Sequence, residues 1–151
     1  MSHVVLIGMM GAGKTTVGRL VADRLGRPFR DSDLAVEERT GRTVAEIFAA
    51  EGEPGFRALE RETLRELLAS PEPAVIAAAG GAVLDAGNRR ALREAGTVVW
   101  LRAEPVVLAR RVEPGGHRPL LADDPAGTLA RLAAEREELY RQTAHVTVDV
   151  D

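Results

Sequence analysis

Eight residues near the amino terminus, Gly8 to Thr15, have the sequence GMMGAGKT and carry the most specific chemical signal in the chain. They match the pattern GxxxxGK[ST], in which the backbone N–H groups of a glycine-rich loop surround a phosphate at the positive end of a helix. Lys14 is the only lysine among 20 basic residues. A compact ammonium on a flexible stem fits between two phosphates inside such a loop, whereas a planar guanidinium is too large. The alternative is a glycine-rich turn that only joins a strand to a helix.

The side chains at the end of this loop are suited to a nucleotide. Thr15 offers a hydroxyl to the Mg²⁺ that accompanies ATP. The motif also follows an apolar, strand-like run and begins a helix-like one, which is the context that it requires. The loop residues expected to contact the nucleotide are Gly11, Ala12, Gly13, Lys14, Thr15 and Thr16.

Two carboxylates, Asp31 and Asp33, stand at the end of a second apolar run, in the sequence RDSDL. In an extended backbone, side chains two residues apart point to the same side. One carboxylate can then face the metal while the other faces a phosphate acceptor, whose hydroxyl proton it can accept during phosphoryl transfer. The alternative is that Asp33 only caps the following helix.

Two arginines on predicted helices are candidates for the acceptor site. Arg57, in GEPGFRALE, precedes Glu60 by three residues, a spacing at which the glutamate can hold the guanidinium in place. Arg136 lies in EREELY, among other charged residues. Each also has a plain explanation, Arg57 as half of a surface salt bridge and Arg136 as part of a solvated helical face.

Two further segments could contribute to a site. Residues 113–125, EPGGHRPLLADDP, are too rich in glycine and proline for regular structure and are predicted to form a lid loop. Arg118 within it can reach a γ-phosphate when the loop closes, or it is simply a solvated loop residue. Gly80 and Gly81 follow the third predicted strand, where bare backbone can approach a ligand closely or merely form a tight turn.

These residues must be positioned by an α/β fold. Short β-branched runs alternate with longer amphipathic ones, and the runs are nearly continuous in apolar residues, as in strands buried on both faces of a parallel sheet. Thr43 and Glu46 form a capping box that predicts the start of one helix. The predicted strands are 3–8, 28–33, 74–81, 97–102 and 145–150, and the other predicted helices are 14–25, 55–69, 85–95, 104–112 and 126–143.

Composition predicts a single domain over residues 1–151. The chain is 45% hydrophobic, which is enough for one core, and its net charge of -3 argues against nucleic acid as a partner. It has no cysteine and no apolar run of membrane-spanning length, so we expect a cytoplasmic protein without a membrane partner. The three histidines are not spaced with carboxylates as metal ligands are, and we predict no histidine metal site.

Taken in order, GMMGAGKTT, DSD, FRALE, GGAV, RPLL and EREELY resemble the motifs of shikimate kinases, and the resemblance runs from Val4 to the end of the chain. It implies a three-layer P-loop fold, with a five-stranded parallel sheet of order 2-3-1-4-5 flanked by helices. It also implies transfer of the γ-phosphate of ATP to the 3-hydroxyl of shikimate, on the route to chorismate and aromatic amino acids. A substrate-binding region at about 32–62 and a lid at about 113–125 would belong to that one domain, and a monomer is the simplest expectation.

The resemblance assigns a role to each candidate residue. Asp31 and Thr15 would hold Mg²⁺, the former through water. Asp33 would bind the shikimate hydroxyls and act as the base. Arg57 and Arg136 would grip the substrate carboxylate, with Gly80 and Gly81 presenting backbone N–H groups beside them. The catalytic set would be Lys14, Asp33 and Arg118, and the nucleotide would be contacted by the loop residues, by Arg118 and by Arg111, stacked near the adenine.

The sequence departs from the family pattern at two places. Ala79 stands where a run of three glycines usually begins, and we predict that its backbone conformation is an ordinary one. Relatives usually continue into a helix beyond the position of Asp151, and without such a helix we expect lower stability. Two other functions remain open: a P-loop kinase for another acceptor, such as gluconate or a nucleotide, and a regulator that binds ATP without catalysis. The regulator would need neither the base Asp33 nor the lid residue Arg118.

Overall fold

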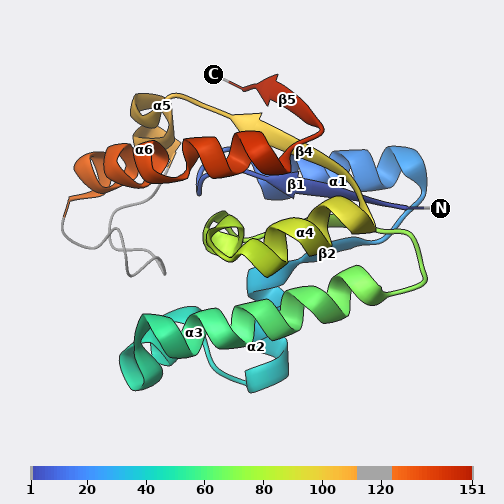
Figure 1. Ribbon diagram of the computed structural model, residues 1–151, viewed down its shortest axis with the longest axis horizontal. Helices are drawn as coiled ribbons and strands as arrows, with labels where there is room; N and C mark the ends of the chain where they lie inside the picture. The colour runs from blue at the N-terminus through green and yellow to red at the C-terminus, as the bar shows by residue number, and fades with distance from the viewer. Residues whose placement is uncertain (1, 112–123, 151) are drawn as a thin grey trace.

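Five parallel strands form the centre of the structure, a computed structural model that describes residues 2–111 and 124–150 (Figure 1). The sheet has the order β2-β3-β1-β4-β5, so the predicted order 2-3-1-4-5 is confirmed. At its centre, Val5 of β1 is paired with Ile76 of β3 and with Val98 of β4. The strands are β1 (His3–Ile7), β2 (Phe29–Asp31), β3 (Val75–Ala77), β4 (Gly96–Arg102) and β5 (Val146–Asp149).

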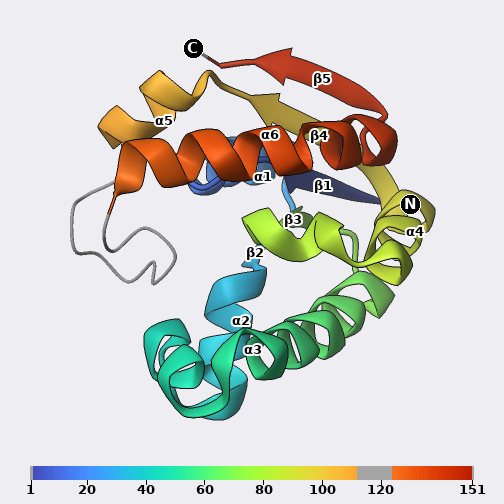
Figure 2. The ribbon, with the colours of Figure 1, turned by 60° about the vertical axis from the view of Figure 1, so that its left-hand side comes forward.

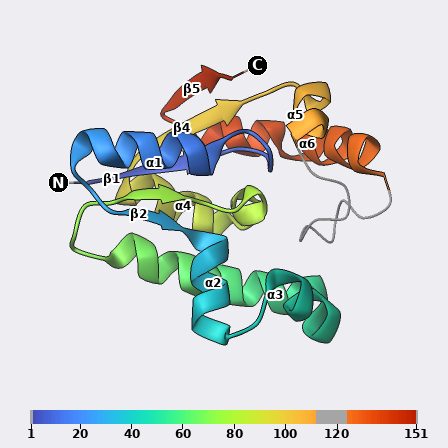
Figure 3. The ribbon, with the colours of Figure 1, turned by 180° about the vertical axis from the view of Figure 1, so that it is seen from behind.

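The helices lie on both faces of the sheet and beyond one of its edges. Figures 1 and 3 show α4 and α6 on one face and α1 on the other, and Figure 2 shows α2 and α3 extending past the β2 edge. No helix in the described part of the chain is long and apolar enough to cross a membrane. The helices are α1 (Lys14–Leu25), α2 (Ser32–Thr40), α3 (Val44–Ala69), α4 (Ala86–Ala95), α5 (Pro105–Arg111) and α6 (Pro125–Thr143), with a 3₁₀ turn, η1, at Gly80–Leu84.

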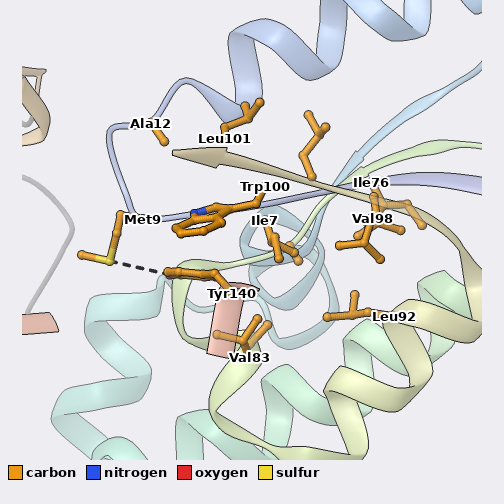
Figure 4. Packing of buried hydrophobic residues seen from close by; sticks show 14 of the residues in the cluster. Ile7, Met9, Ala12, Ile76, Val83, Leu92, Val98, Trp100, Leu101 and Tyr140 are labelled. Carbon is orange, nitrogen blue, oxygen red and sulfur yellow. Dashed lines mark hydrogen bonds between the residues drawn. The ribbon is translucent and has the colours of Figure 1, made fainter. Parts of the chain in front are cut away.

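The main core lies between the sheet and its helices, as the apolar strands predict. Val5, Ile76 and Val98 have no exposed surface. Trp100 of β4 stacks on Tyr140 of α6 with ring centroids 5.6 Å apart, which joins the helix layer to the sheet (Figure 4). Burial on both faces explains why the central strands β1 and β3 show no alternation of apolar and polar residues, whereas the exposed edge strand β5 alternates valine with threonine and aspartate.

A smaller apolar cluster holds α2 against α3. Its buried members are Val36, Val44, Ile47 and Phe56. The predicted capping box at the start of α3 is present, since the Thr43 hydroxyl accepts a hydrogen bond from the Glu46 N–H and the Glu46 carboxylate accepts one from the Thr43 N–H. This cluster is separate from the main core, so it gives the α2–α3 unit its own packing.

Helix α3 is two helical runs joined by a kink at Gly52, where φ is 70° and ψ is −178°. The sequence predicted helix from the Thr43 capping box and over 55–69 but did not predict the kink between them. Pro54 lies two residues after the kink, and a proline cannot donate the hydrogen bond that a continuous helix would need there.

Residues 28–33 and 74–81 are each predicted to form a strand, and both observed strands end earlier than predicted. The second strand ends at Asp31 and α2 begins at Ser32, because Asp31 Oδ1 accepts hydrogen bonds from the N–H groups of Asp33 and Leu34 and so starts a helix. The third strand ends at Ala77, and Gly80 already belongs to η1. Ala79 has φ −57° and ψ 149°, which confirms that its backbone is ordinary.

We predict that Gly18→Ala destabilises the protein, although alanine favours a helix over glycine by about 1 kcal/mol. A Cβ on Gly18 of α1 would lie 2.4 Å from Cε1 of Phe29, a ring packed against the core. Overpacking of this kind costs about 1–3 kcal/mol, so the free energy of unfolding in urea should fall.

Gly87→Ala in α4 is the matched control. A Cβ on Gly87 would meet the end of the half-exposed Arg65 side chain, which can move away, and would lie 3.1 Å from Oδ2 of the capping residue Asp85, which needs to shift by only a few tenths of an ångström. This variant should be as stable as the wild type or more stable. Equal urea midpoints for Gly18→Ala and Gly87→Ala would show that the Phe29 ring yields without cost.

Candidate active site

One cavity of about 540 Å³ opens where β1, β2 and β3 end. Parallel strands bring the segments that follow them to a common edge, so loops distant in sequence converge there. Ala12 has a side chain buried in the core and does not line the cavity, and Arg118 lies outside the described residues. The predicted site residues that line the cavity are Gly11, Gly13, Lys14, Thr15, Thr16, Asp31, Asp33, Arg57, Gly80, Gly81, Arg111 and Arg136.

The loop before α1 is shaped to receive a phosphate. Gly13 has φ 96°, a conformation that a residue with a side chain rarely adopts, and it begins α1 without a capping side chain. By contrast, α2, α3, α4 and α6 each begin with a side-chain cap. Lys14 Nζ lies against the same loop and donates to the carbonyl oxygens of Gly8 at 2.6 Å and Met9 at 3.1 Å. The N–H groups at the start of α1 can therefore be satisfied by an anion beside the ammonium.

Thr15 and Asp31 bring two hard oxygen atoms together at one side of this loop. Thr15 Oγ1 donates to Asp31 Oδ2 at 3.3 Å, while Asp31 Oδ1 is already held by the start of α2. Within residues 2–111 and 124–150 there is no group of three or more histidine, cysteine or acidic side chains able to hold a metal. Two protein oxygens fit Mg²⁺ better than Ca²⁺ or Zn²⁺, because Mg²⁺ commonly keeps water and phosphate as its remaining ligands.

Asp33 lines the cavity from the first turn of α2, and not from an extended strand as the sequence argument assumed. Asp31 is the residue that caps α2, so the alternative in which Asp33 is only a cap is also wrong. Both carboxylates reach the same cavity because the chain turns from strand to helix between them.

Arg57 is held by two carboxylates, and its predicted pairing with Glu60 is confirmed. Arg57 Nη1 lies 3.1 and 3.0 Å from the two oxygens of Glu60, and Nη2 lies 3.1 Å from Glu53. Glu60 is only 1% exposed, and this burial raises the pKa of its carboxyl, while the positive charge of Arg57 opposes the shift. Glu60 itself lines the cavity and was not predicted as a site residue, although its spacing from Arg57 signalled the contact.

Arg136 is buried, so its interpretation as part of a solvated helical face is wrong. Its side chain is among the largest that are fully buried, and its Nε and Nη1 have no hydrogen-bond partner within the described residues. A buried charge without full compensation is costly, and such costs are typical of sites that await a ligand. The arrangement suggests an anion as that ligand.

The two arginines converge on the glycine pair from different helices. A Cβ on Gly81 would lie 2.3 Å from Arg57 Nη1, and a Cβ on Gly80 would lie 3.5 Å from Arg136 Nη1. A side chain at Gly81 would therefore displace the Arg57 guanidinium. The pair gives both planar cations access to one small volume, a geometry suited to a carboxylate.

The cavity also has an apolar wall that sequence analysis did not identify as part of the site. Phe48 and Phe56 of α3 lie with ring centroids 4.8 Å apart, and both line the cavity with Leu34 and Val44. Their helical spacing signalled only that they would be buried. The Arg57 guanidinium lies 5.3 Å from the centroid of the Phe56 ring, so the apolar wall adjoins a cation, an arrangement that suits a ligand with a carbon ring and an acidic group.

Arg111 lies at the nucleotide side of the cavity. Its Nη1 donates to the Gly11 carbonyl at 3.3 Å and its Nη2 to the Val150 carbonyl at 2.9 Å. These contacts join the phosphate-binding loop to the end of β5. The expected stacking on adenine stays a prediction.

The fold and this cavity define a P-loop kinase for a small molecule. The sequence model of the shikimate kinase family matches residues 10–151. A shikimate kinase from Symbiobacterium thermophilum is 54% identical, with 99% of this chain and 87% of that protein covered, and one from Dechloromonas aromatica is 47% identical, with 97% and 80% covered. The chain belongs to the shikimate kinase family.

Solved structures agree with this assignment. The structure of a shikimate kinase from Acinetobacter baumannii in complex with shikimate has a TM-score of 0.97 and 42% identity, and the match covers 100% of this chain and 84% of that one. A gluconokinase from Sinorhizobium meliloti has a TM-score of 0.60 and 26% identity, covering 99% and 82%. The fold is thus shared with kinases of other acceptors, but the likeness is much greater within the family.

We predict that Glu60→Gln gains stability relative to the wild type as pH rises from about 4 to about 7. Because the folded state raises the Glu60 pKa, it binds this proton more tightly than the unfolded chain does. The favourable contribution is complete below the ordinary glutamate pKa of about 4.3 and is lost as pH rises through the folded pKa. Glutamine stays neutral throughout. Urea unfolding of both proteins across this range measures the difference, and a trend in favour of the wild type would show that the Arg57 ion pair outweighs burial.

Proposed function

We propose that this protein transfers the γ-phosphate of ATP to the 3-hydroxyl of shikimate, giving shikimate 3-phosphate and ADP for chorismate and aromatic amino-acid biosynthesis. One observation carries the proposal. The buried Arg136 guanidinium, with two nitrogens unpartnered within the described residues, faces the same cavity as the phosphate-binding loop. Shikimate has a carboxylate for this cation, a carbon ring for the apolar wall, and hydroxyls for Asp33. Membership of the shikimate kinase family supports the same substrate.

On the nucleotide side, we propose that the loop residues Gly11 to Thr16 bind the phosphates through their backbone N–H groups. Lys14 would leave the carbonyls that it now contacts and lie between the β- and γ-phosphates. Thr15 and Asp31 are the residues that would hold Mg²⁺, Asp31 through water. When bound, Mg²⁺ supplies positive charge that offsets the charge developing on the phosphate oxygens.

On the acceptor side, Asp33 would orient the 3-hydroxyl and accept its proton. The hydroxyl oxygen forms a bond to the γ-phosphorus while the bond from that phosphorus to the β–γ bridging oxygen breaks, which leaves ADP. Arg57 and Arg136 would bind the carboxylate as planar forks, and the N–H groups of Gly80 and Gly81 would contribute beside them. These residues hold the acceptor in line with the phosphate, so their main contribution is positioning.

Three expectations rest on the sequence and stay predictions. Arg118, in the lid predicted at about 113–125, would reach the transferring phosphate, but it falls outside the described residues. A monomer is expected because one domain contains both halves of the site. A cytoplasmic location is expected from the composition.

Gluconate is the second candidate acceptor, because the gluconokinase neighbour shares the fold. Gluconate also has a carboxylate and hydroxyls, but it is an open chain and would not cover the wall formed by Phe48 and Phe56 as a six-membered carbon ring does. A regulator that only binds ATP does not need a buried, partly unpartnered arginine at an acceptor site.

The test is ADP release from Mg·ATP, measured with no acceptor, with shikimate and with gluconate. We expect release with shikimate only, because the two arginines, the glycine pair and the apolar wall fit a ring acid. Release with gluconate alone would replace the proposed substrate.

Asp33→Asn is the control for the chemistry. It keeps the size of the side chain but removes the base, so turnover with shikimate should be abolished while Mg·ADP affinity, measured by calorimetry, stays nearly the same. Normal turnover in this variant would remove Asp33 from the reaction. ATP binding without turnover for any acceptor in the wild type would favour the regulator.

We predict that Arg136→Met raises the KM for shikimate by roughly thirtyfold or more, since truncating one side of a buried charge pair costs about 2 kcal/mol or more. The same change should keep or increase the free energy of unfolding without ligand, because an apolar side chain replaces a buried charge that lacks full compensation. Arg141→Met is the matched control. Arg141 lies on the same helix but is half-exposed and paired with Glu137 and Glu138, so neither KM nor stability should change appreciably. A large loss of stability in Arg136→Met would instead assign Arg136 a structural role.

A further inference from the structure

Tyr140 occupies a position that joins three parts of the site. It is the only tyrosine in the chain and is 1% exposed. Its ring stacks on Trp100, and Figure 4 shows its hydroxyl directed toward Met9 of the phosphate-binding loop. The hydroxyl lies 2.6 Å from the Gly80 carbonyl oxygen and 3.6 Å from Met9 Sδ. Since a hydroxyl has one proton, the short contact to Gly80 is the principal hydrogen bond.

This hydrogen bond determines the orientation of the peptide that joins the glycine pair. The Gly80 carbonyl and the Gly81 N–H belong to one planar trans peptide and point in opposite directions. Holding the carbonyl toward Tyr140 therefore fixes the Gly81 N–H on the side away from it. Two peptides earlier in the chain, the Ala79 N–H donates to Ser32 Oγ at 2.8 Å. The turn is thus fixed by hydroxyls from α2 and α6, and flexible glycines gain a defined geometry.

The Tyr140 hydroxyl also influences the position of the Arg136 guanidinium. Tyr140 follows Arg136 by four residues on α6, so the two side chains lie on one face of the helix. A Cβ on Gly80 would be 3.5 Å from Arg136 Nη1, so the glycine backbone is close to the guanidinium. Tyr140 also forms a side-chain hydrogen bond with Arg136, so the tyrosine positions the guanidinium as well as the Gly80 carbonyl. Nε and Nη1 of Arg136 have no hydrogen-bond partner within the described residues, which agrees with this role.

Tyr140 can serve this role over a wide pH range. Burial raises the pKa of its hydroxyl to about 12, against the opposing effect of the nearby Arg136 charge. The hydroxyl therefore stays protonated and remains a hydrogen-bond donor under ordinary assay conditions.

We propose that Tyr140 is a positioning residue for the acceptor: its hydrogen bond to the Gly80 carbonyl fixes the glycine pair and leaves Arg136 available to the acceptor carboxylate. This inference rests on the proposed function. It differs from that function because Tyr140 acts through Gly80 and Arg136, and its ring packs in the core.

Tyr140→Phe in the full chain tests the proposal, because it removes the hydroxyl and keeps the ring. We expect the KM for shikimate to rise roughly tenfold, which corresponds to about 1.4 kcal/mol. The KM for ATP and kcat should stay within about twofold, since the lost interaction contributes equally to the ground state and the transition state. Equal KM values for shikimate in Tyr140→Phe and the wild type, or equal increases in both KM values, would overturn the proposal.

Thr143→Val is the matched control for a lost buried hydroxyl. Thr143 is on the same helix, has no exposed surface, and donates to the Leu139 carbonyl at 2.7 Å within the helix. We expect this variant to lose stability without any change in the KM for shikimate. An increase in that KM equal to the one in Tyr140→Phe would mean that loosening of α6, and not the Gly80 contact, is responsible.

A spectroscopic measurement decides the question if Tyr140→Phe is not folded under assay conditions. Because the chain has a single tyrosine, growth with 3-fluorotyrosine places one fluorine label at this site. Saturating shikimate should shift its ¹⁹F resonance more than saturating Mg·ADP does, and an unchanged resonance with shikimate would overturn the proposal. Failure of the proposed function is recognised separately, as absence of shikimate-dependent ADP release by the wild type.

Discussion

Burial of the Arg136 guanidinium is the constraint around which the candidate site is arranged. A cation removed from water must be compensated, and its Nε and Nη1 lack partners within the described residues. The Glu60 carboxylate lies close enough to attract this charge, and Tyr140 forms a side-chain hydrogen bond with Arg136. Glu60 pairs closely with Arg57, however, so one carboxylate is shared between two arginines. The site thus retains net positive character, and an acidic ligand completes its compensation.

The parallel sheet brings the other groups of the site to the cavity in which Arg136 lies. Loops after β1 and β3 and the start of α2 after β2 meet at one edge, where the phosphate-binding loop, the two carboxylates and the glycine pair share a cavity. The α2–α3 unit, with its own apolar cluster, adds Arg57 and the aromatic wall from beyond the β2 edge. Helix α6 adds Arg136 from the opposite side. Two substrates can therefore meet between elements that are packed independently.

Local sequence signals predicted which helices and strands form better than they predicted the residues at which these helices and strands end. The start of α1, the capping box at Thr43 and the Arg57–Glu60 contact follow from short-range patterns, whereas the confirmed strand order was implied only by the resemblance to shikimate kinases. The course of residues 32–40 was missed because Asp31 can end an extended strand or cap a helix, and only the contacts of its carboxylate decide between them. Ala12 was expected to contact the nucleotide, yet its methyl group packs in the core and leaves only its backbone for a ligand.

The sequence by itself determined the phosphate-binding loop, because its glycines, its lysine and its threonine act through neighbours a few residues away. It also determined the parallel α/β class, through apolar runs and their spacing. Only the tertiary structure decided that Arg136 is buried, that Tyr140 binds the Gly80 carbonyl, and that two arginines flank the glycine pair. The physical reason is distance along the chain: a helix with many charged residues looks solvated until its neighbours show which of its faces is covered.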